Sequence, residues 1–518
     1  MKLMQQSINI RFYRSFATAI AKPKKSKWNS VVGLEVHAQI SSKTKLFSGA
    51  GVEFGAPPNT RVSAFDAAIP GTLPVLNERC VVAGIQAALA LDCTINPVSM
   101  FDRKHYFYAD LPAGYQITQQ RAPLAKNGML KFCVSVPGVS MKSYQKVSRL
   151  HQLQLEQDSG KSLHDAYENR TLIDLNRAGV GLIEFVFEPD LNNGEEAASL
   201  IKELVLILRA TGVCSCHMNE GALRVDANIS INRHGDPLGV RTEVKNIGSV
   251  RGVAHAVDYE IQRQIDLVES GGRVHNETRS WDALSKKTVV MRDKEVLQDY
   301  RFMPEPNLPP LRLNITDDQT SELISVERIR KSLPELPAQT RNNLIEHHEL
   351  RQESADVLIN ESSLMRYYTE ILKTQPAVPP KNVANFLIND FVGHCNKKKI
   401  SVDDCQISDE NLAELIAMMH NGTINIALSR IILQEMLENP NQRPSEIATA
   451  KNLKQITDPA EIEKICLDII GKNQDKVQKY KQGKKRSLGF LIGEVGKETE
   501  QKANMVLVDK IMKELLDK

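Results

Sequence analysis

The sequence of 518 residues predicts an α+β protein, with a mainly antiparallel sheet domain first, an all-helical region second and a small helical tail domain last. Two observations predict this order. Between residues 28 and 310, short apolar runs alternate with turns rich in glycine and proline. Beyond the proline-rich segment 304–311, turn residues become fewer and apolar residues recur at helical spacing. A chain of this length also exceeds one ordinary hydrophobic core, which favours several domains.

The first 27 residues predict a mitochondrial transit peptide that takes no part in the fold. They contain no acidic residue, and basic residues recur among them, including Arg11, Arg14 and the lysines between positions 22 and 27. An acid-free amphipathic start that carries arginine is typical of such peptides; a disordered basic tail is the alternative. We therefore expect the protein in the mitochondrial matrix.

Residues 28–310 are predicted to form the sheet domain, interrupted by two helices. Apolar residues recur at helical spacing in segments 77–91 and 195–211, and Gly212 follows the second segment as a typical helix-ending residue. The segment 31–40 instead alternates apolar and polar residues, as a half-buried strand does. Its alternation places Glu35 and His37 on one face, opposite an apolar back.

Residues 311–402 are predicted to form a helical domain, and residues 403–518 a helical tail domain. The last expected helix, Met505 to Leu516, has Val508 and Met512 on one apolar face and lysines elsewhere.

Composition disfavours several classes of protein. The formal net charge is only +3, so any contact with RNA should be local rather than based on bulk charge. No run approaches the roughly 20 apolar residues of a membrane-spanning helix, so we expect no membrane insertion. The eight cysteines form no C-x-x-C pair, which gives no sign of a zinc ribbon or a redox motif.

Carboxylates recur on predicted strands between apolar neighbours, where a charge is costly unless it is paired or bound to a metal. If these strands share one sheet, the side chains can converge on the His37 face. Oxygen ligands with one imidazole suit Mg²⁺ or Mn²⁺ better than Zn²⁺. The acidic residues concerned are Glu35, Glu156, Asp158, Glu184, Asp226 and Glu243.

Basic residues near these carboxylates complete the components of a phosphoryl-transfer site. The candidates for binding phosphate are Arg103, Lys104, Lys161 and Lys245. A P-loop is absent, because Leu155 stands where the loop before Gly160 and Lys161 would need glycine. No dinucleotide-binding glycine motif and no G-x-S-x-G nucleophile motif is present, which disfavours Rossmann enzymes and serine hydrolases.

Eight longer motifs extend this pattern between Val32 and Leu311, and the similarity that they indicate continues over almost all of the chain after residue 27. They are VGLEVHAQI from Val32, PGTLPVLN from Pro70, FDRKHYFYADLPAGYQITQ from Phe101, LEQDSGKSLHD from Leu155, IDLNRAGVGLIE from Ile173, EGALRVDANIS from Glu220, TEVKNIGS from Thr242 and DYRFMPEPNLPPL from Asp299. In these motifs the sequence resembles the B subunit of the glutamyl-tRNA(Gln) amidotransferases (aspartyl/glutamyl-tRNA amidotransferases), in the mitochondrial form.

The resemblance implies a fold and a reaction. Residues 28–310 would form a cradle domain that uses ATP and Mg²⁺ to phosphorylate the γ-carboxyl group of glutamate on misacylated tRNA(Gln). Ammonia from an amidase-type A subunit would then give Gln-tRNA(Gln), and a small C subunit would brace the heterotrimer. The helical parts would bind the tRNA. The chain would thus act as part of a carbon–nitrogen ligase with glutamine as amido donor.

By the same resemblance, five residues match site positions of the family: Glu35, His37, Glu184, Asp226 and Glu243. The expected metal ligands are His37, Glu184 and, from the segment 156–158, Glu156, with Gln157 and Asp158 as open alternatives. Many bacterial relatives have cysteine pairs in the region of residues 47–71, where this chain has none, so we expect no structural zinc.

The sequence leaves three alternatives. The tail residues Lys484, Lys485 and Arg486 either contact tRNA phosphates or form an ordinary solvated face. The chain could also be a tRNA-binding scaffold whose acidic site no longer acts, although the retained acidic residues speak against that. A stand-alone carboxylate–amine ligase is the third hypothesis; it predicts activity without any partner.

Overall fold

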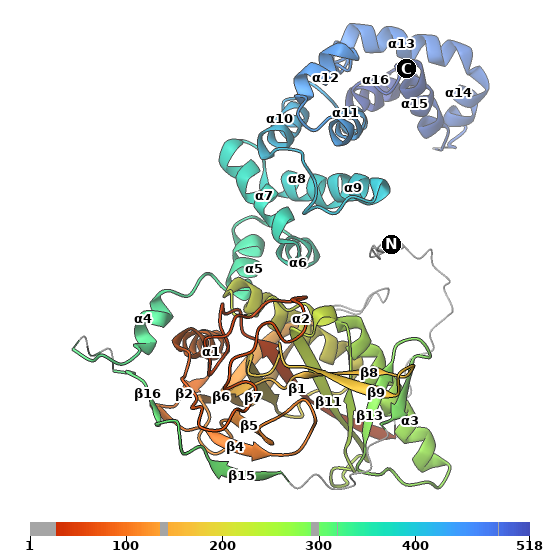
Figure 1. Cartoon of the computed structure of the whole chain (residues 1–518). Helices are drawn as coiled ribbons and strands as arrows, with labels where there is room; N and C mark the ends of the chain where they lie inside the picture. Colours follow the sequence, from red (N-terminus) through yellow and green to blue (C-terminus); the bar gives the residue numbers. More distant parts are fainter. Residues whose placement is uncertain are drawn as a thin grey trace. The chain divides into compact units, whose positions relative to one another are not determined.

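The computed structural model describes residues 27–134, 143–291, 300–316, 318, 320–484 and 486–517 (Figure 1). The predicted transit peptide lies outside these residues, except for Lys27. The chain separates into two compact units on either side of the Pro337–Ala338 bond. The first is built on a sheet and the second only on helices, as the predicted α+β class requires.

A nine-stranded sheet forms the centre of the first unit, with strand order β14-β13-β12-β11-β1-β10-β7-β6-β2. Neighbouring strands run antiparallel except β12 and β13, which run parallel. The strands are β1 (Trp28–Gln39), β2 (Thr94–Ile95), β6 (Ala125–Val134), β7 (Tyr144–Gln157), β10 (Gly181–Phe187), β11 (Leu223–Arg233), β12 (Thr242–Lys245), β13 (Thr278–Asp282) and β14 (Lys287–Val290). The prediction of a mainly antiparallel sheet is confirmed.

Three helices pack against the apolar side of this sheet: α1 (Glu78–Ala90), α2 (Gly194–Ala210) and α3 (Val250–Glu269). The first two confirm the helices expected at 77–91 and 195–211. Helix α3 was not predicted, because its buried side includes Glu260 and Gln264 beside small residues such as Ala254 and Ala256. Such a helix is less apolar on average than α1 or α2, although a buried polar network fixes it in place.

The polar side of the sheet is partly covered by a three-stranded sheet of order β15-β4-β5. Its strands are β4 (Asp102–His105), β5 (Tyr115–Thr118) and β15 (Arg301–Pro304). Strand β5 contacts β7, and residues 152–157 of β7 are buried on both faces as a result. Two smaller ladders complete the unit: β8 (Lys161–Asp165) with β9 (Arg170–Asp174), and β3 (Val98–Ser99) with β16 (Leu311–Arg312).

The first unit continues beyond residue 310, where the sequence places the end of the sheet domain. Strand β16 pairs with β3, and helix α4 (Val326–Lys331) packs against α1. These contacts keep residues 311–337 with the sheet.

The second unit is helical, as predicted, and its helix α16 begins and ends at the predicted residues. Its elements are α5 (Pro337–Glu346), α6 (Gln352–Asn360), α7 (Ser362–Thr374), α8 (Pro380–Asn385), a π-helical segment (Phe386–Phe391), α9 (Val392–Lys398), α10 (Asp409–His420), α11 (Ile426–Glu438), α12 (Pro444–Ala450), α13 (Pro459–Lys472), α14 (Gln474–Lys481), α15 (Arg486–Glu498) and α16 (Met505–Leu516). One apolar core joins residues between Leu344 and Leu453, and another joins residues between Ile462 and Leu516. Position 403, the predicted start of the tail, falls inside the segment whose residues form the first core.

None of the helices in the described part of the chain combines the length and the apolar character that crossing a bilayer requires.

Candidate active site

Strand β1 carries the centre of the site, because strand register brings polar residues of three strands onto one face. His37 lies opposite Glu184 of β10 on one side and opposite Arg224 of β11 on the other. Glu35, two residues earlier on the same face, lies opposite Asp226. The apolar residues between them, such as Val36, point into the buried core. The alternation predicted for segment 31–40 is thus confirmed.

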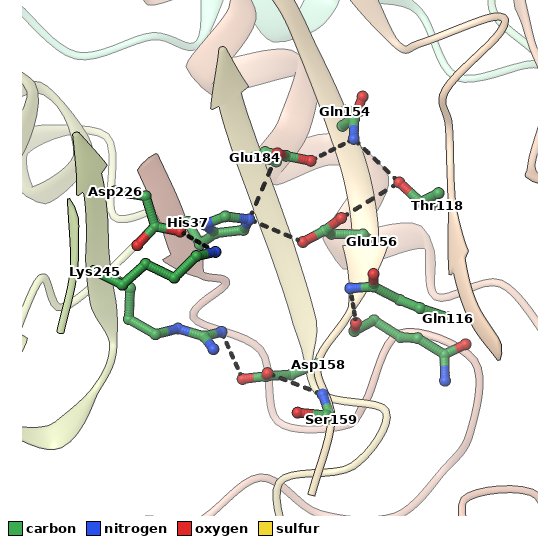
Figure 2. Close-up of polar contacts among 12 residues, drawn as sticks. His37, Gln116, Thr118, Gln154, Glu156, Asp158, Ser159, Glu184, Asp226 and Lys245 are labelled. Carbon is green, nitrogen blue, oxygen red and sulfur yellow. Dashed lines mark hydrogen bonds and ion pairs between the residues drawn. The ribbon is translucent and has the colours of Figure 1, made fainter. Parts of the chain in front are cut away.

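His37, Glu156 and Glu184 form a compact group that we call the His37 cluster. The imidazole Nε2 lies 3.3 Å from Oε1 of Glu156 and 3.6 Å from Oε1 of Glu184 (Figure 2). One ligand atom of each residue lies within 4.8 Å of the other two, which is close enough for all three to contact one metal ion. The three side chains come from β1, β7 and β10, so the central sheet itself fixes their spacing.

Gln154 and Thr118 hold the two carboxylates of the His37 cluster (Figure 2). The amide of Gln154 donates hydrogen bonds to Oε2 of Glu184 and, at 3.1 Å, to the hydroxyl of Thr118. The Thr118 hydroxyl in turn donates to Oε2 of Glu156 at 3.3 Å. Each carboxylate therefore keeps its other oxygen, Oε1, directed at His37.

Burial controls protonation in the His37 cluster. It raises the pKa of Glu184 to about 8, and the neighbouring charge of Glu156 adds to this rise. Burial also raises the pKa of Glu156 above its usual range. The pKa of His37 falls to about 3 because of burial, with Arg224, Lys245 and Lys104 as further causes. The imidazole is thus neutral at pH 7 and Glu184 holds a proton.

A divalent cation suits this donor set. A neutral imidazole offers its nitrogen lone pair, and the two buried carboxylates repel each other unless a proton or a cation lies between them. A cation would replace the proton of Glu184 and relieve that repulsion. Two carboxylates and one imidazole are ligands that Mg²⁺ or Mn²⁺ accepts.

Asp226, Glu243 and Lys245 form a second group, the Lys245 cluster. The ammonium Nζ lies 3.1 Å from Oδ2 of Asp226 and 3.3 Å from Oε1 of Glu243. Burial alone would lower the pKa of Lys245, but the two carboxylates outweigh it and raise this pKa above its usual range. Burial likewise raises the pKa of Asp226, against the opposing charge of Lys245.

Hydrogen bonds from neighbouring strands hold two further carboxylates. The amide of Asn228 donates to Oε1 of Glu35 at 2.9 Å, and the hydroxyl of Thr278 donates to Oε2 of Glu243 at 3.0 Å. Burial raises the pKa of Glu35, with the charge of Glu184 as the next cause. All five residues predicted as catalytic therefore lie on one face of the sheet, in or beside the two clusters.

A cavity of about 470 Å³ opens between the two clusters. Its walls carry cations beside the carboxylates, which is the arrangement that a polyphosphate and an anionic substrate require. The ionisable lining residues are His37, Lys104, Glu156, Asp158, Arg224, Asp226 and Lys245, with the aromatic rings of Tyr106 and Tyr300. The ammonium of Lys104 lies 4.5 Å from the centre of the Tyr300 ring.

The four predicted phosphate-binding residues separate into two groups. Lys104 and Lys245 line the cavity. Arg103, the neighbour of Lys104 on β4, points the other way and binds the buried Glu305 at 2.6 and 3.1 Å. Lys161 is exposed on β8 and does not line the cavity.

The side chains of residues 156–158 also lie in different places. Glu156 belongs to the His37 cluster, whereas Gln157 accepts from the backbone amide of Ile117 at 3.2 Å. Asp158 accepts from Arg224 at 2.8 Å and lines the cavity.

Arg224, Gln154 and Thr118 also belong to the site, and none of them was predicted. Strand alternation contains the signal for two of them: Arg224 lies two residues before Asp226 on β11, and Gln154 two before Glu156 on β7. Thr118 reaches the site from the separate sheet of β5, which no local pattern indicates.

In the second unit, Lys484 and Arg486 are exposed where α15 begins, and Lys485 lies outside the described residues.

Comparison with known proteins agrees with this architecture in both units. The family described as "GatB/GatE catalytic domain" matches residues 30–319, and the family described as "GatB domain" matches residues 366–516. The chain is 55% identical to the B subunit of the mitochondrial glutamyl-tRNA(Gln) amidotransferase of Aedes aegypti over 509 residues, which cover 97% of this chain and 96% of the relative.

Two further relatives match almost the same share of this chain at lower identity. The B subunit of the human mitochondrial glutamyl-tRNA(Gln) amidotransferase is 48% identical over 95% of this chain and 89% of its own length. The B subunit of the aspartyl/glutamyl-tRNA(Asn/Gln) amidotransferase of Rickettsia canadensis is 42% identical over 96% of this chain and 99% of its own length. Similarity at this level runs through both units and includes the strands that build the site. The chain therefore belongs to the B-subunit family of the glutamyl-tRNA(Gln) amidotransferases.

Proposed function

We propose that this chain activates tRNA-borne glutamate with ATP and Mg²⁺ in the cavity between the His37 and Lys245 clusters. As a member of its family, it is one component of an amidotransferase that makes Gln-tRNA(Gln), and it is the mitochondrial form of that component. The observation that carries the proposal is the convergence of His37, Glu156 and Glu184 beside a cavity lined with cations. We retain this hypothesis over the scaffold and the stand-alone ligase.

His37, Glu156 and Glu184 would hold the Mg²⁺ ion. When bound, the ion supplies positive charge that offsets the charge of the phosphates and lets an anionic carboxylate approach them. Lys104 and Lys245 add positive charge at the cavity wall. Asp226 and Glu243 hold the Lys245 ammonium in one position. Its charge therefore already faces the cavity before a substrate binds.

The proposed chemistry explains why a carboxylate needs ATP. Direct amidation of a carboxylate would have to expel oxide, which is a very poor leaving group. Instead, a γ-carboxylate oxygen attacks the γ-phosphorus of ATP, ADP departs, and an acyl phosphate forms. Ammonia then attacks the carbonyl carbon, and inorganic phosphate leaves with the former carboxylate oxygen. The nitrogen loses a proton, and the product is the amide of Gln-tRNA(Gln).

Partner proteins complete the reaction in this proposal. The chain has no recognisable glutaminase nucleophile of its own, so the amidase-type partner would supply ammonia and the small third component would stabilise the complex. The second unit would contact the tRNA, with Lys484, Lys485 and Arg486 at phosphates.

The reconstituted complex tests the proposal against its two alternatives. The mature chain with both partners should form Gln-tRNA(Gln) from Glu-tRNA(Gln), glutamine and ATP, and Glu-tRNA(Gln) should stimulate ATP cleavage. A non-catalytic scaffold would show no such cleavage dependent on this chain. A stand-alone ligase would make Gln-tRNA(Gln) from glutamine without partners, which would refute the interpretation as one component of a complex.

Metal removal provides a further prediction. Chelation of divalent ions should abolish ATP cleavage, and added Mg²⁺ or Mn²⁺ should restore it, because two repelling carboxylates need a cation. Calorimetry of Mn²⁺ binding checks the site without any activity assay: the His37→Ala variant should lose the binding event. Unchanged Mn²⁺ binding in that variant would place the ion elsewhere.

Gln154 allows a milder test of the same site. Gln154→Ala removes the hydrogen bond to Glu184 and should weaken Mn²⁺ binding roughly tenfold, as loss of outer-shell support does. Gln145→Ala is the matched control, because Gln145 is an exposed glutamine at the far end of the same strand. Equal Mn²⁺ affinity of the two variants would show that Gln154 does not orient the carboxylate.

A further inference from the structure

Arg224 lines the cavity with a cationic guanidinium group that is held in place. Only part of its hydrogen-bonding capacity is used. One terminal nitrogen donates to Oδ2 of Asp158 at 2.8 Å. Within the described part of the chain, its Nε is buried and has no hydrogen-bond partner. The side chain is 35% exposed, on the side that lines the cavity. A guanidinium group has five N–H donors in a planar fork, so the terminal N–H groups that Asp158 does not use are available to a ligand in the cavity.

Other cations near the site have less capacity for a planar anion. Two nitrogens of Arg103, Nε and one terminal nitrogen, donate to Glu305, and Lys245 lies between two carboxylates. Lys104 presents a compact ammonium, which binds as a point charge rather than as a two-pronged donor. The guanidinium of Arg224 is therefore the group best suited to a carboxylate with two equivalent oxygens.

Apolar side chains contribute part of the cavity wall. Met218, Leu223 and Ile247 are among them, and Ile247 follows Asn246, whose backbone is left-handed (φ 61°) directly after β12. A glutamyl side chain has the same character, with two methylene groups that end in a carboxylate. Apolar lining residues and a partly satisfied arginine in the same cavity therefore match the reacting part of the substrate.

We propose that Arg224 binds the side-chain carboxylate of the tRNA-borne glutamate and that Asp158 positions the guanidinium for this contact. The proposal rests on the function proposed above and names the residue that recognises its substrate. Arg224 lies opposite His37 in the strand register, so the bound carboxylate would lie beside the His37 cluster. Arg224 itself touches the substrate; Asp158 is a positioning residue that acts through it.

A binding experiment without ATP separates this proposal from the chemistry. In competition binding to the assembled complex, wild type should prefer Glu-tRNA(Gln) over Gln-tRNA(Gln), because only the former carries a carboxylate. The expected preference is roughly tenfold, the size of one charge-assisted contact. Arg224→Gln should abolish it and Arg224→Lys should reduce it. Arg251→Lys, at an exposed arginine of α3, is the control and should keep it.

Several results would overturn the proposal. These are a wild-type complex without the preference, or an Arg224→Gln complex that keeps it. In the second case, weaker binding of an ATP analogue would assign the arginine to phosphate. Failure of the proposed function is a separate outcome, visible as a wild-type complex that makes no Gln-tRNA(Gln) at all.

Positioning by Asp158 is tested by rescue. The Arg224→Ala variant should lose about a hundredfold in kcat. Added guanidinium ion should recover part of that loss, because Asp158 can still bind the ion at the position of the missing side chain. In an Arg224→Ala/Asp158→Asn double variant, guanidinium should no longer rescue. Equal rescue of both variants would contradict a positioning role for Asp158, and no rescue of the single variant would contradict the role of the guanidinium itself.

Discussion

Replacing Glu184 by alanine in the assembled complex should reduce Gln-tRNA(Gln) formation about a thousandfold, which corresponds to about 4 kcal/mol of lost transition-state stabilisation. Glu184 is one of three groups that converge on a single point, and it lies beside His37 and Glu156. Its removal leaves one carboxylate and one imidazole, too few charges to hold a divalent cation tightly. The measurement is the rate of ATP cleavage stimulated by Glu-tRNA(Gln), together with the yield of Gln-tRNA(Gln).

Glu188→Ala is the matched control for this variant. Glu188 follows β10 directly, is partly exposed and lies 3.1 Å from the exposed His151 rather than at the cavity. Its loss should leave the rate within about twofold, because exposed pairs of this kind contribute little. Normal ATP cleavage by the Glu184→Ala complex would show that the assignment of the site is wrong.

Replacing Asp66 by alanine should destabilise the first unit by about 3–5 kcal/mol, the cost of leaving one member of a buried ion pair without its partner. The ammonium of Lys45 is fully buried and lies 3.1 Å from Oδ2 of Asp66, whose side chain is 1% exposed. Asp66 also accepts from the hydroxyl of Ser48 and the backbone amide of Ser63. This network fixes the long loop between β1 and α1, so its loss affects the strand that carries His37.

Thermal unfolding of the assembled complex measures this effect, and the transition should move down by about 6 °C or more. Glu53→Ala is the control, because Glu53 forms an exposed ion pair with Arg61 in the same loop, and its loss should change little. A double variant, Lys45→Met with Asp66→Leu, should recover part of the loss, since apolar residues can replace a buried pair. Equal transitions for Asp66→Ala and Glu53→Ala would contradict this explanation.

Much of the candidate site was predictable from strand alternation. The pattern around Glu35 and His37 indicates one polar face, and the same rule applied to β11 and β7 locates Asp226 and Glu156. The pairing of strands distant in sequence was not predictable in this way. Strand β1 has β10 and β11 as neighbours, and no local pattern shows that His37 faces Glu184 or Arg224.

Two features of the fold explain the remaining differences. Helix α3 buries Glu260 and Gln264 within a polar network, where Glu260 accepts from Arg263 and Thr288, so it is less apolar on average than the two predicted helices. The sequence indicates lysine and arginine candidates only by their proximity along the chain, whereas neighbouring residues of a strand point to opposite faces. Arg103 and Lys104 are adjacent on β4, and only Lys104 lines the cavity.

The fate of one oxygen atom provides the most direct test of the proposed activation. Glu-tRNA(Gln) with ¹⁸O in both oxygens of the γ-carboxylate is supplied to the complex with ATP and glutamine, and the released phosphate is analysed by mass spectrometry. Activation through an acyl phosphate predicts one ¹⁸O atom in each phosphate formed, and almost no phosphate from the Glu184→Ala complex. Phosphate without ¹⁸O, released while Gln-tRNA(Gln) forms at the normal rate, would contradict the claim that this site phosphorylates the glutamate.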